Sequence, residues 1–396
     1  MYQSIIKLSM SGLLALTFSV GASAQGAFSL SGSLKGMPDS VKVVLVDVED
    51  PNGERTVLAE TMATGDSFRL SGDVSSPRMC NLAFQRFSPK RGEYATVFST
   101  RFMADPAAIT LSSELPFDSL RNARGIERHI RVSGSKANDE FAEYIAQVSP
   151  AELAAQEASY KSASKWFETH DNKDTMAVYN RIKNQTAADL LKAQRDFIAA
   201  HPAYNISAYL TQRELEKVFA YTADEVEAMT ALVKACPDTA RTSTVEKRRK
   251  HALRYALRRD CPEFEVTAPD GKTAQFTSLI TPGKYTFIDF WASWCGPCRS
   301  AIPHVRELHK KYADKLNVFS VSLDQTDKPW LKAMDEEKME WPQYHLDGEK
   351  QMSDGSYAFF ITSIPRLILL DDKGRVVCST NLPDEVTAYL ATHLGE

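Results

Sequence analysis

The pattern of apolar and polar residues changes twice along the chain. From about residue 27 to 125, short apolar runs alternate with polar residues, as in VKVVLVDVED, and turn-forming stretches such as PNGE and TGDS separate them. Several short strands at this spacing are typical of an antiparallel sandwich or barrel. We therefore predict an all-β sandwich domain over 27–125. It contains no catalytic-looking cluster of acids, histidines or glycines, so we expect a scaffolding, docking or dimerisation role.

The second pattern covers residues 136–258, where apolar side chains recur every three or four positions. This period predicts amphipathic α-helices, and we interpret the stretch as a helical linker region. The pairs Ser149–Pro150, His201–Pro202 and Cys236–Pro237 should mark helix boundaries, because the residue before a proline avoids the helical conformation. The basic run at 246–259 is better explained as a solvated helix face than as a site for a polyanion.

In the third pattern, over 261–396, strands and helices alternate. EFEVTAPDGKTAQF resembles a hairpin with Asp-Gly in its turn, and YTFIDFW is nearly continuous in apolar residues, as expected for a strand buried on both faces. A helix should run from Cys295 to about Tyr312. Further strands are expected at NVFSVSL, RLILLD and RVVCST, and helices at KPWLKAMDEEK, GSYAFFI and DEVTAYLATHL. These elements predict an α/β domain with a central mixed sheet.

The first residues differ from all three patterns. Lys7 precedes the apolar stretch SGLLALTFSV, and ASA ends at Ala24. This order is typical of a secretory signal peptide over 1–24, since the apolar run is shorter than the ~20 residues that span a bilayer. We therefore expect a soluble exported protein that does not span the membrane once processed, located in the periplasm if the organism is a bacterium.

Composition excludes some partners. The 396 residues are 43% hydrophobic and 25% charged, with a formal net charge of -4. A mildly acidic chain has no global electrostatic footprint for nucleic acid or for an anionic membrane surface. No pattern for a metal, nucleotide or other cofactor is visible, so we expect none.

The candidate chemistry lies in two cysteines, Cys295 and Cys298, where a buried strand turns into a helix. At the helix N-terminus, unpaired backbone N–H groups and the helix dipole stabilise a thiolate, which is the nucleophile in disulfide exchange. Three residues make nearly one helical turn, so Cys298 can attack a mixed disulfide formed by Cys295. Gly296 and Pro297 suit the turn, because proline is tolerated in the first helical turn.

Three other interpretations of the pair are weaker. A structural zinc site usually needs a second pair of ligands, and the remaining cysteines stand singly, whereas His304 and His309 lie on the same helix as the pair. A c-type haem needs histidine directly after the second cysteine, where Arg299 stands. A permanent structural disulfide is possible, but so tight a loop is easily reduced.

The segment DFWASWCGPC, at 289–298, resembles the active-site segment of the thioredoxin superfamily. With its leading PEFEVTAPDGK hairpin, the domain over 261–396 is similar to exported TlpA/ResA-like thiol-disulfide oxidoreductases, which implies a thioredoxin-like fold. The preceding residues resemble, more loosely, the β-domain of unknown function and the helical linker that often accompany such a domain. The resemblance therefore covers about a third of the chain.

The resemblance also implies roles for single residues. Asp289, an acid within an apolar strand, would assist proton transfer from the resolving thiol of Cys298. Trp294 would shape the surface around Cys295. Pro365 would be a cis-proline, which places the backbone of Ile364 beside the dithiol, where an extended substrate chain can pair with it. The family's cytosolic members carry a lysine in the next strand, and NVFSVSL has none.

Gly296 and Pro297 offer no charge or hydrogen-bonding side chain to the thiolate, and Ile364 is common before the proline in reductase-like members. Both features favour a reductase of disulfide-containing or oxidised exported proteins, supplied with electrons by a membrane donor. A disulfide oxidase or isomerase stays possible. A thiol peroxidase is disfavoured by the CxxC pair. A further alternative is an envelope-binding protein with an ancillary redox domain. In that case deletion of 27–125 would abolish binding but leave the redox activity intact.

The four remaining cysteines are single. Cys80 and Cys378 lie in strand-like patterns and should be core thiols. Cys236 and Cys261 flank the last predicted helix of the linker, each followed by proline, so a disulfide between them is a hypothesis.

Overall fold

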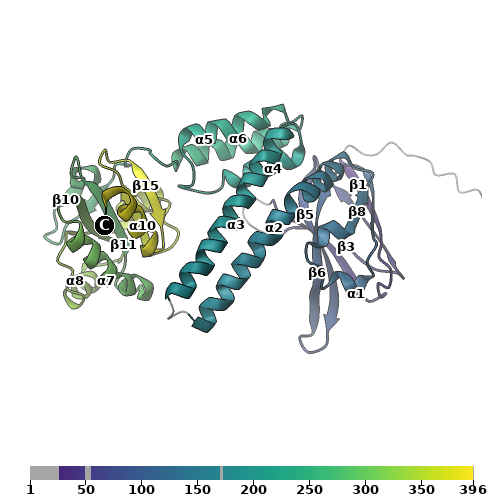
Figure 1. Cartoon of the computed structure of the whole chain (residues 1–396), viewed down its shortest axis with the longest axis horizontal. Coiled ribbons are helices and arrows are strands. Elements are labelled where there is room, and N and C mark those ends of the chain that lie inside the picture. The colour runs from purple at the N-terminus through teal and green to yellow at the C-terminus, as the bar shows by residue number, and fades with distance from the viewer. Residues whose placement is uncertain (1–25, 50–54, 170–172, 396) are drawn as a thin grey trace, which may run out of the picture. The chain divides into compact units, whose positions relative to one another are not determined.

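The computed structural model describes residues 26–49, 55–169 and 173–395 (Figure 1). These residues form two compact units, divided between Leu190 and Leu191. The division falls inside a helix, so the domain limits expected from the sequence stay a prediction. The predicted signal peptide lies outside the described residues. Among the described helices, none combines the length and apolar character needed to cross a membrane.

The first unit contains a β-sandwich of two four-stranded sheets (Figure 1). The order in one sheet is β4-β1-β7-β8 and in the other β3-β2-β5-β6. The strands are β1 (Ala27–Ser33), β2 (Lys42–Asp47), β3 (Val57–Met62), β4 (Ser67–Asp73), β5 (Arg78–Ser88), β6 (Glu93–Ala104), β7 (Ala108–Ser113) and β8 (Ile130–Ser133). The inner faces of both sheets share one apolar core, which confirms the predicted sandwich. One pairing departs from the antiparallel pattern, because β1 runs parallel to β7.

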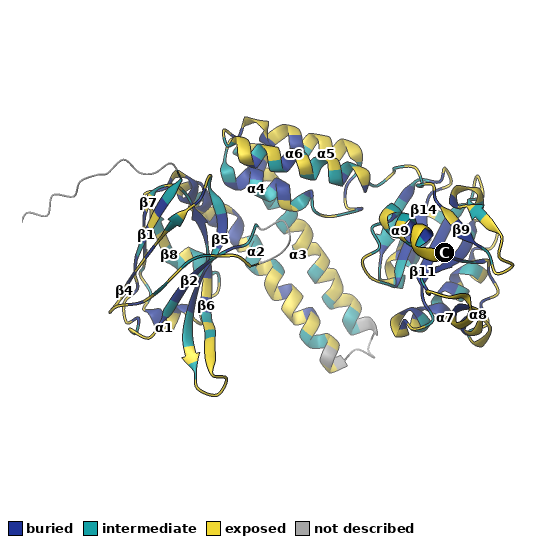
Figure 2. Ribbon diagram, turned by 180° about the vertical axis from the view of Figure 1, so that it is seen from behind, coloured by how far each residue is buried: buried dark blue, intermediate teal, exposed yellow. Residues whose placement is uncertain are grey.

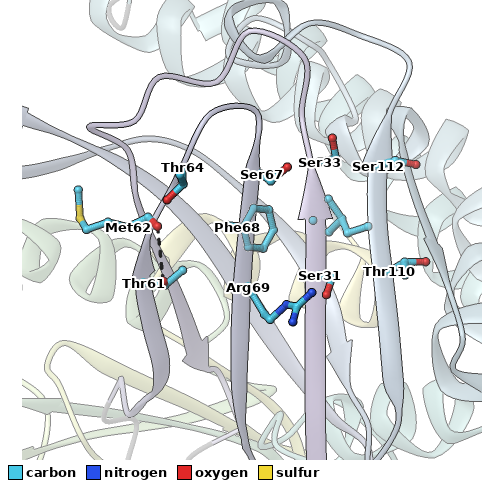
Figure 3. Close-up of a pocket in the computed structure, with 12 residues that line it drawn as sticks. Ser31, Ser33, Thr61, Met62, Thr64, Ser67, Phe68, Arg69, Thr110 and Ser112 are labelled. Carbon is cyan, nitrogen blue, oxygen red and sulfur yellow. Dashed lines mark hydrogen bonds between the residues drawn. The ribbon is translucent and has the colours of Figure 1, made fainter. Parts of the chain in front are cut away.

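Gly32 in β1 is required by the packing of this core. It lies opposite Phe68 of β4, and a Cβ atom at Gly32 would stand 2.0 Å from the Phe68 ring. Figure 3 shows that ring beside the strand that carries Ser31 and Ser33. The Phe68 ring is itself held in place, since it is buried and makes an edge-to-face contact with the Phe84 ring, with 5.6 Å between the ring centres.

We therefore expect Gly32→Ala to lower the free energy of unfolding of the sandwich by about 2 kcal/mol, because overpacking forces side chains and backbone to shift. Denaturant unfolding followed by circular dichroism would measure the change. Ser33→Ala, at an exposed position of the same strand, is the matched control and should behave as wild type. Equal stability of the two variants would contradict the prediction.

Long helices follow the sandwich: α2 (Lys136–Thr169) and α3 (Lys173–Ala200), then α4 (Asn205–Glu214), α5 (Ala223–Leu232) and α6 (Thr239–Arg254). Figure 2 shows that much of α3 is exposed. Of the α3 side chains that the structure describes, those of Phe197 and Ile198 are buried. The predicted boundaries at His201–Pro202 and Cys236–Pro237 are confirmed, since α3 ends at Ala200 and α6 begins at Thr239.

The boundary expected at Ser149–Pro150 is wrong, because α2 continues through Pro150. Side chains on both sides of the proline hold the helix together. The Tyr144 hydroxyl donates to a Glu152 carboxylate oxygen at 2.7 Å, across the proline. Arg101 of β6 donates to both Glu152 oxygens, at 3.2 and 2.8 Å. These contacts compensate for the one backbone donor that proline lacks.

The C-terminal domain is built on a seven-stranded mixed sheet with the order β10-β9-β13-β12-β11-β14-β15. The strands are β9 (Glu265–Thr267), β10 (Thr273–Gln275), β11 (Tyr285–Trp291), β12 (Leu316–Ser322), β13 (Gln343–His345), β14 (Arg366–Leu370) and β15 (Val376–Thr380). The predicted hairpin is confirmed as β9–β10, which pair antiparallel. The polar strand β13 was not predicted, because its three residues form no apolar run.

Central strand β11 runs parallel to β12 and antiparallel to β14. One face of the sheet packs against an apolar cluster that includes Phe287 and Trp291 of β11, and we call this cluster the dithiol cluster because it also contains Cys295 and Cys298. Ile288 and Phe290 belong to a second cluster, the opposite cluster. The domain's helices are α7 (Gly296–Lys311), α8 (Asp327–Glu336), α9 (Gly348–Ala358) and α10 (Pro383–Leu394).

Candidate active site

Cys295 and Cys298 lie where β11 passes into α7, as the sequence predicts. Cys295 is the N-cap residue of α7, and its sulfur accepts a hydrogen bond from the backbone N–H of Cys298 at 3.2 Å. The two sulfurs form a disulfide, so the structure represents the oxidised form. Backbone donors at a helix N-terminus stabilise negative charge, so the same position favours a thiolate on Cys295 after reduction.

Access to the two sulfurs differs from access to their surroundings. Cys295 is 5% exposed and Cys298 2% exposed, whereas neighbouring Trp294 is 69% exposed. Gly296 and Pro297, between the cysteines, are also exposed. Trp294 and the Gly-Pro turn are therefore the exposed part of this surface, next to the buried Cys295.

Asp289 is buried in the middle of β11, with 2% of its surface exposed. It has the same parity along the strand as Phe287 and Trp291, so it points to the face of the dithiol cluster. Burial raises the pKa of Asp289 to about 7, and a hydrogen bond donated by the Ser320 hydroxyl at 3.1 Å opposes the shift. A carboxyl group with such a pKa can accept or release a proton near neutral pH.

The partner of this acid and the next link of its hydrogen-bond chain were not predicted from the sequence. Ser320 of β12 pairs in register with Asp289, and its hydroxyl accepts a hydrogen bond from the Trp341 indole N–H at 2.8 Å. Trp341 belongs to the dithiol cluster. The apolar run NVFSVSL carries two serines, Ser320 and Ser322, which is a usable signal, but the pairing of Ser320 with Asp289 depends on strand register.

A second buried acid, also missed in the sequence, fixes the turn before the dithiol. Asp324 is 1% exposed and accepts hydrogen bonds from the Ser293 backbone N–H at 2.9 Å and from the Ser293 hydroxyl at 2.6 Å. The Ser322 hydroxyl donates to the same carboxylate at 2.7 Å. These bonds satisfy the buried carboxyl group and hold Ser293, directly before Trp294, in place.

The loop that leads into β14 contains a cis peptide bond between Ile364 and Pro365. Pro365 is buried, and Ile364 is half-buried. The Ile364 side chain packs against the dithiol cluster and also against the opposite cluster. The structure thus brings Ile364 to the same apolar cluster as the two cysteines.

The remaining thiols differ from the dithiol. Burial raises the pKa of Cys80 and Cys261 to about 12 and the pKa of Cys378 to about 11. The hypothetical Cys236–Cys261 disulfide is not present. Cys236 packs in the core of the helical region, whereas Cys261 packs against the opposite cluster. Within the residues that the structure describes, no group of three or more histidines, cysteines or acids is arranged to hold a metal ion.

The mixed sheet, the dithiol at the N-terminus of α7 and the cis-proline loop define a thioredoxin-like domain. Residues 283–376 match the family described as thioredoxin-like. Residues 28–141 match a domain of unknown function, DUF4369.

Among curated proteins, the chain is 30% identical over 120 residues to the thiol-disulfide oxidoreductase ResA of Bacillus anthracis, covering 30% of this chain and 66% of ResA. It is also 30% identical over 116 residues to the thioredoxin-like protein YneN of Bacillus subtilis, covering 28% of this chain and 64% of YneN. The chain therefore spans slightly less than two thirds of the length of these relatives.

Two solved structures are similar to about a third of this chain. A thiol-disulfide oxidoreductase from Bacteroides fragilis is 24% identical, with a TM-score of 0.32, over 34% of this chain and 98% of that one. A thiol:disulfide interchange protein from a Bacteroides species is also 24% identical, with a TM-score of 0.33, over 36% of this chain and 91% of that one.

Proposed function

We propose that the chain is an exported thiol-disulfide oxidoreductase that reduces protein disulfides through its WCGPC dithiol. The observation that carries this proposal is the position of Cys295 at the N-terminus of α7, with Cys298 one turn behind it. The N-terminal segment that resembles a signal peptide supports export to the periplasm. The chemistry uses thiols alone and needs no bound cofactor.

The proposed reaction moves two electrons from the dithiol to the substrate. The Cys295 thiolate attacks one sulfur of a substrate disulfide, which forms a mixed disulfide and releases one substrate thiolate. Asp289 accepts the proton of the Cys298 thiol. The Cys298 thiolate then attacks the Cys295 sulfur, which closes the Cys295–Cys298 disulfide and releases the second substrate sulfur as a thiolate. A membrane electron donor restores the dithiol. Trp294 and the backbone of Ile364 would receive the substrate chain.

The charges around the dithiol favour the reducing direction. The nearest cation along the chain, Arg299, is paired with Glu337 at 2.6 Å and with Glu336 at 3.1 Å. Gly296 and Pro297 add no charged side chain. Arg299 is therefore engaged by two carboxylates rather than held for the thiolate, and a thiolate that is only moderately stabilised belongs to a more reducing couple.

We expect the Cys295–Cys298 couple to have a reduction potential at or below about -250 mV, near the reductases of this fold. Equilibration of the mature chain in dithiothreitol or glutathione buffers would measure it, with Cys295→Ser as the blank. A value above about -180 mV would instead identify a disulfide oxidase or isomerase. The absence of any titratable couple would refute the enzymatic proposal.

One observation favours a second candidate, an envelope-binding protein with an ancillary redox domain. The N-terminal sandwich carries an open pocket of about 630 Å³, lined by hydroxyl side chains and by the exposed Arg69 (Figure 3). Hydroxyl and guanidinium groups can both hydrogen-bond a polar ligand. This candidate is distinguished by retention of the redox activity and loss of binding when residues 27–125 are deleted.

A further inference from the structure

The last residues of the helical region are joined to the edge of the C-terminal sheet. The Arg258 backbone N–H donates to the Val376 carbonyl at 2.6 Å, and the Val376 N–H donates to the Arg259 carbonyl at 3.0 Å. The Cys261 N–H donates to the Gly374 carbonyl, also at 3.0 Å. Because β15 is the last strand of the sheet, this segment covers its outer edge. The segment that leaves α6 is thus a fixed part of the C-terminal domain.

The side chains of this segment satisfy the C-terminal end of α9. Arg259 donates from its guanidinium to the carbonyl of Ala358 at 2.5 Å, and the Tyr255 hydroxyl donates to the carbonyl of Tyr357 at 2.9 Å. The last carbonyls of a helix have no partner within the helix, and a cation is favoured beside them. Arg259 and Tyr255 together therefore cap α9.

Three aromatic rings fix the orientation of the Arg259 guanidinium. It lies 5.6 Å from the ring centre of Phe219, 5.8 Å from Tyr255 and 6.0 Å from Phe359. A planar guanidinium can stack on such rings and donate at its edge at the same time, which a lysine ammonium cannot do. We call Arg259, Phe219 and Tyr255 the α9 clamp.

The end of α9 held by the clamp leads directly into the loop that carries the cis Ile364–Pro365 bond. Phe359 is fully buried, and the Phe360 ring contacts the Tyr255 ring, with 5.1 Å between the ring centres. Ile364 follows four residues after Phe360 and packs against the dithiol cluster. It also packs against the opposite cluster, which contains Phe219 and Tyr255. Packed side chains therefore connect the clamp to the dithiol without a break.

The backbone supports the same connection. The described residues other than glycine with positive φ are Phe219, Arg258, Lys338 and Phe360. Phe219 belongs to the α9 clamp. Arg258 directly precedes Arg259 of the clamp, and Phe360 follows α9. Such conformations persist where surrounding contacts impose them, and they cluster at functional sites.

We propose that Arg259 is a positioning residue, which holds the segment from Phe359 to Pro365 in the geometry that receives a protein substrate. The α9 clamp thereby makes the end of the helical region a determinant of substrate fit. This inference rests on the proposed disulfide exchange at Cys295.

The test compares Arg259→Ala and Arg259→Lys with wild type in the full mature chain. Insulin serves as the protein disulfide and an aromatic small-molecule disulfide as a substrate that needs no extended chain. We expect Arg259→Ala to raise KM for insulin about tenfold, because displacement of a positioning element weakens substrate binding. Its kcat, its reaction with the small disulfide and the midpoint potential should match wild type. The KM of Arg259→Lys for insulin should lie between those of wild type and Arg259→Ala.

Amide hydrogen exchange provides a second readout that needs no activity. The Ile361 N–H donates to the Ser356 carbonyl at 2.8 Å, so its exchange reports on the end of α9. Exchange at Phe360 and Ile361 should accelerate in both Arg259 variants. Arg213→Ala, an exposed arginine of α4 that pairs with Glu216, is the matched control and should change neither readout.

Unchanged insulin KM together with unchanged exchange would overturn the positioning role. An equal loss with both disulfides would also overturn it, because that result indicates general damage to the domain. If Arg259→Ala fails to fold, Arg259→Lys decides the question by the same two readouts. A wild-type chain that reduces neither disulfide would refute the proposed function instead, and hydrogen exchange would still report on the clamp.

Discussion

A Cys298→Ser chain that has been reduced and mixed with a disulfide-bonded protein is expected to accumulate a covalent adduct through Cys295. The attacking thiol remains at the N-terminus of α7, but the sulfur that would release the substrate is gone. Multiple turnover should fall by at least about a thousandfold, because the two cysteines act as one unit. Cys295→Ser should lose turnover to the same degree and form no adduct.

Non-reducing gel electrophoresis and mass mapping would identify the adduct, and dithiothreitol should remove it. Cys295 is the N-cap residue of α7 and Cys298 lies within the helix, which favours Cys295 as the attacking thiol. An adduct mapped to Cys298 in the Cys295→Ser chain would reverse the assignment of attacking and resolving thiols. An adduct mapped to Cys80, Cys261 or Cys378 would place the chemistry outside the dithiol.

Asp289→Asn is expected to slow disulfide reduction about a hundredfold near pH 7, because it removes the group that we propose as the acceptor of the Cys298 proton. The wild-type rate should rise with pH around a midpoint near 7, the pKa that burial gives Asp289. Asp289→Asn should lack this rise of the rate with pH. Ser320→Ala provides a second test. The Ser320 hydrogen bond lowers the pKa of Asp289, so its loss should shift the midpoint of the rate profile to higher pH.

Asp289→Asn should also change how the free energy of unfolding depends on pH. In the unfolded chain the carboxyl has its ordinary pKa of 3.8, and in the folded chain its pKa is about 7. Below about pH 4 both states hold the proton, so the group contributes nothing. As pH rises from about 4 to 7, only the folded chain retains the proton, so the free energy of unfolding falls. Above about pH 7 both states have lost the proton, and the free energy of unfolding levels off. The loss is about 4 kcal/mol across this window.

Asp289→Asn should remove that loss, so the variant's stability should stay level over the window in which wild type declines. Denaturant unfolding of the C-terminal domain at pH 4 and pH 8 would measure both chains. A variant whose stability falls as steeply as wild type would show that another group causes the decline. A variant with an unaltered rate profile would remove Asp289 from the proton path while leaving the stability result to stand.

The sequence was most informative where one short segment carries both structure and chemistry. The apolar run at 285–291 and the cysteine pair that follows it predict a buried strand, a helix start and the dithiol, because each depends on neighbouring residues. Pro150 shows the opposite case. Proline predicts a break, yet α2 continues because Arg101, about fifty residues earlier in the chain, holds Glu152 beyond the proline. Contacts of that range are invisible to a local pattern.

The same distinction separates the predicted from the unpredicted parts of the site. Cys295, Cys298 and Asp289 stand in one segment, whereas Ser320 reaches Asp289 only through strand pairing. Arg259 is part of a basic run that suggests a solvated helix face, but in the structure it is enclosed by three rings and the end of α9. Its environment depends on residues forty positions earlier and a hundred positions later in the chain.

The high pKa values of Cys80, Cys261 and Cys378 affect how these thiols would react with oxidants. Cys80 and Cys261 have pKa values of about 12, against an ordinary 9.0. At a given pH their reactive thiolate population is about a thousandfold smaller than that of an ordinary cysteine. Mispaired bridges and stray alkylation at these positions should therefore form slowly. Toward oxidants and thiol reagents, Cys80, Cys261 and Cys378 should therefore react far more slowly than ordinary cysteines.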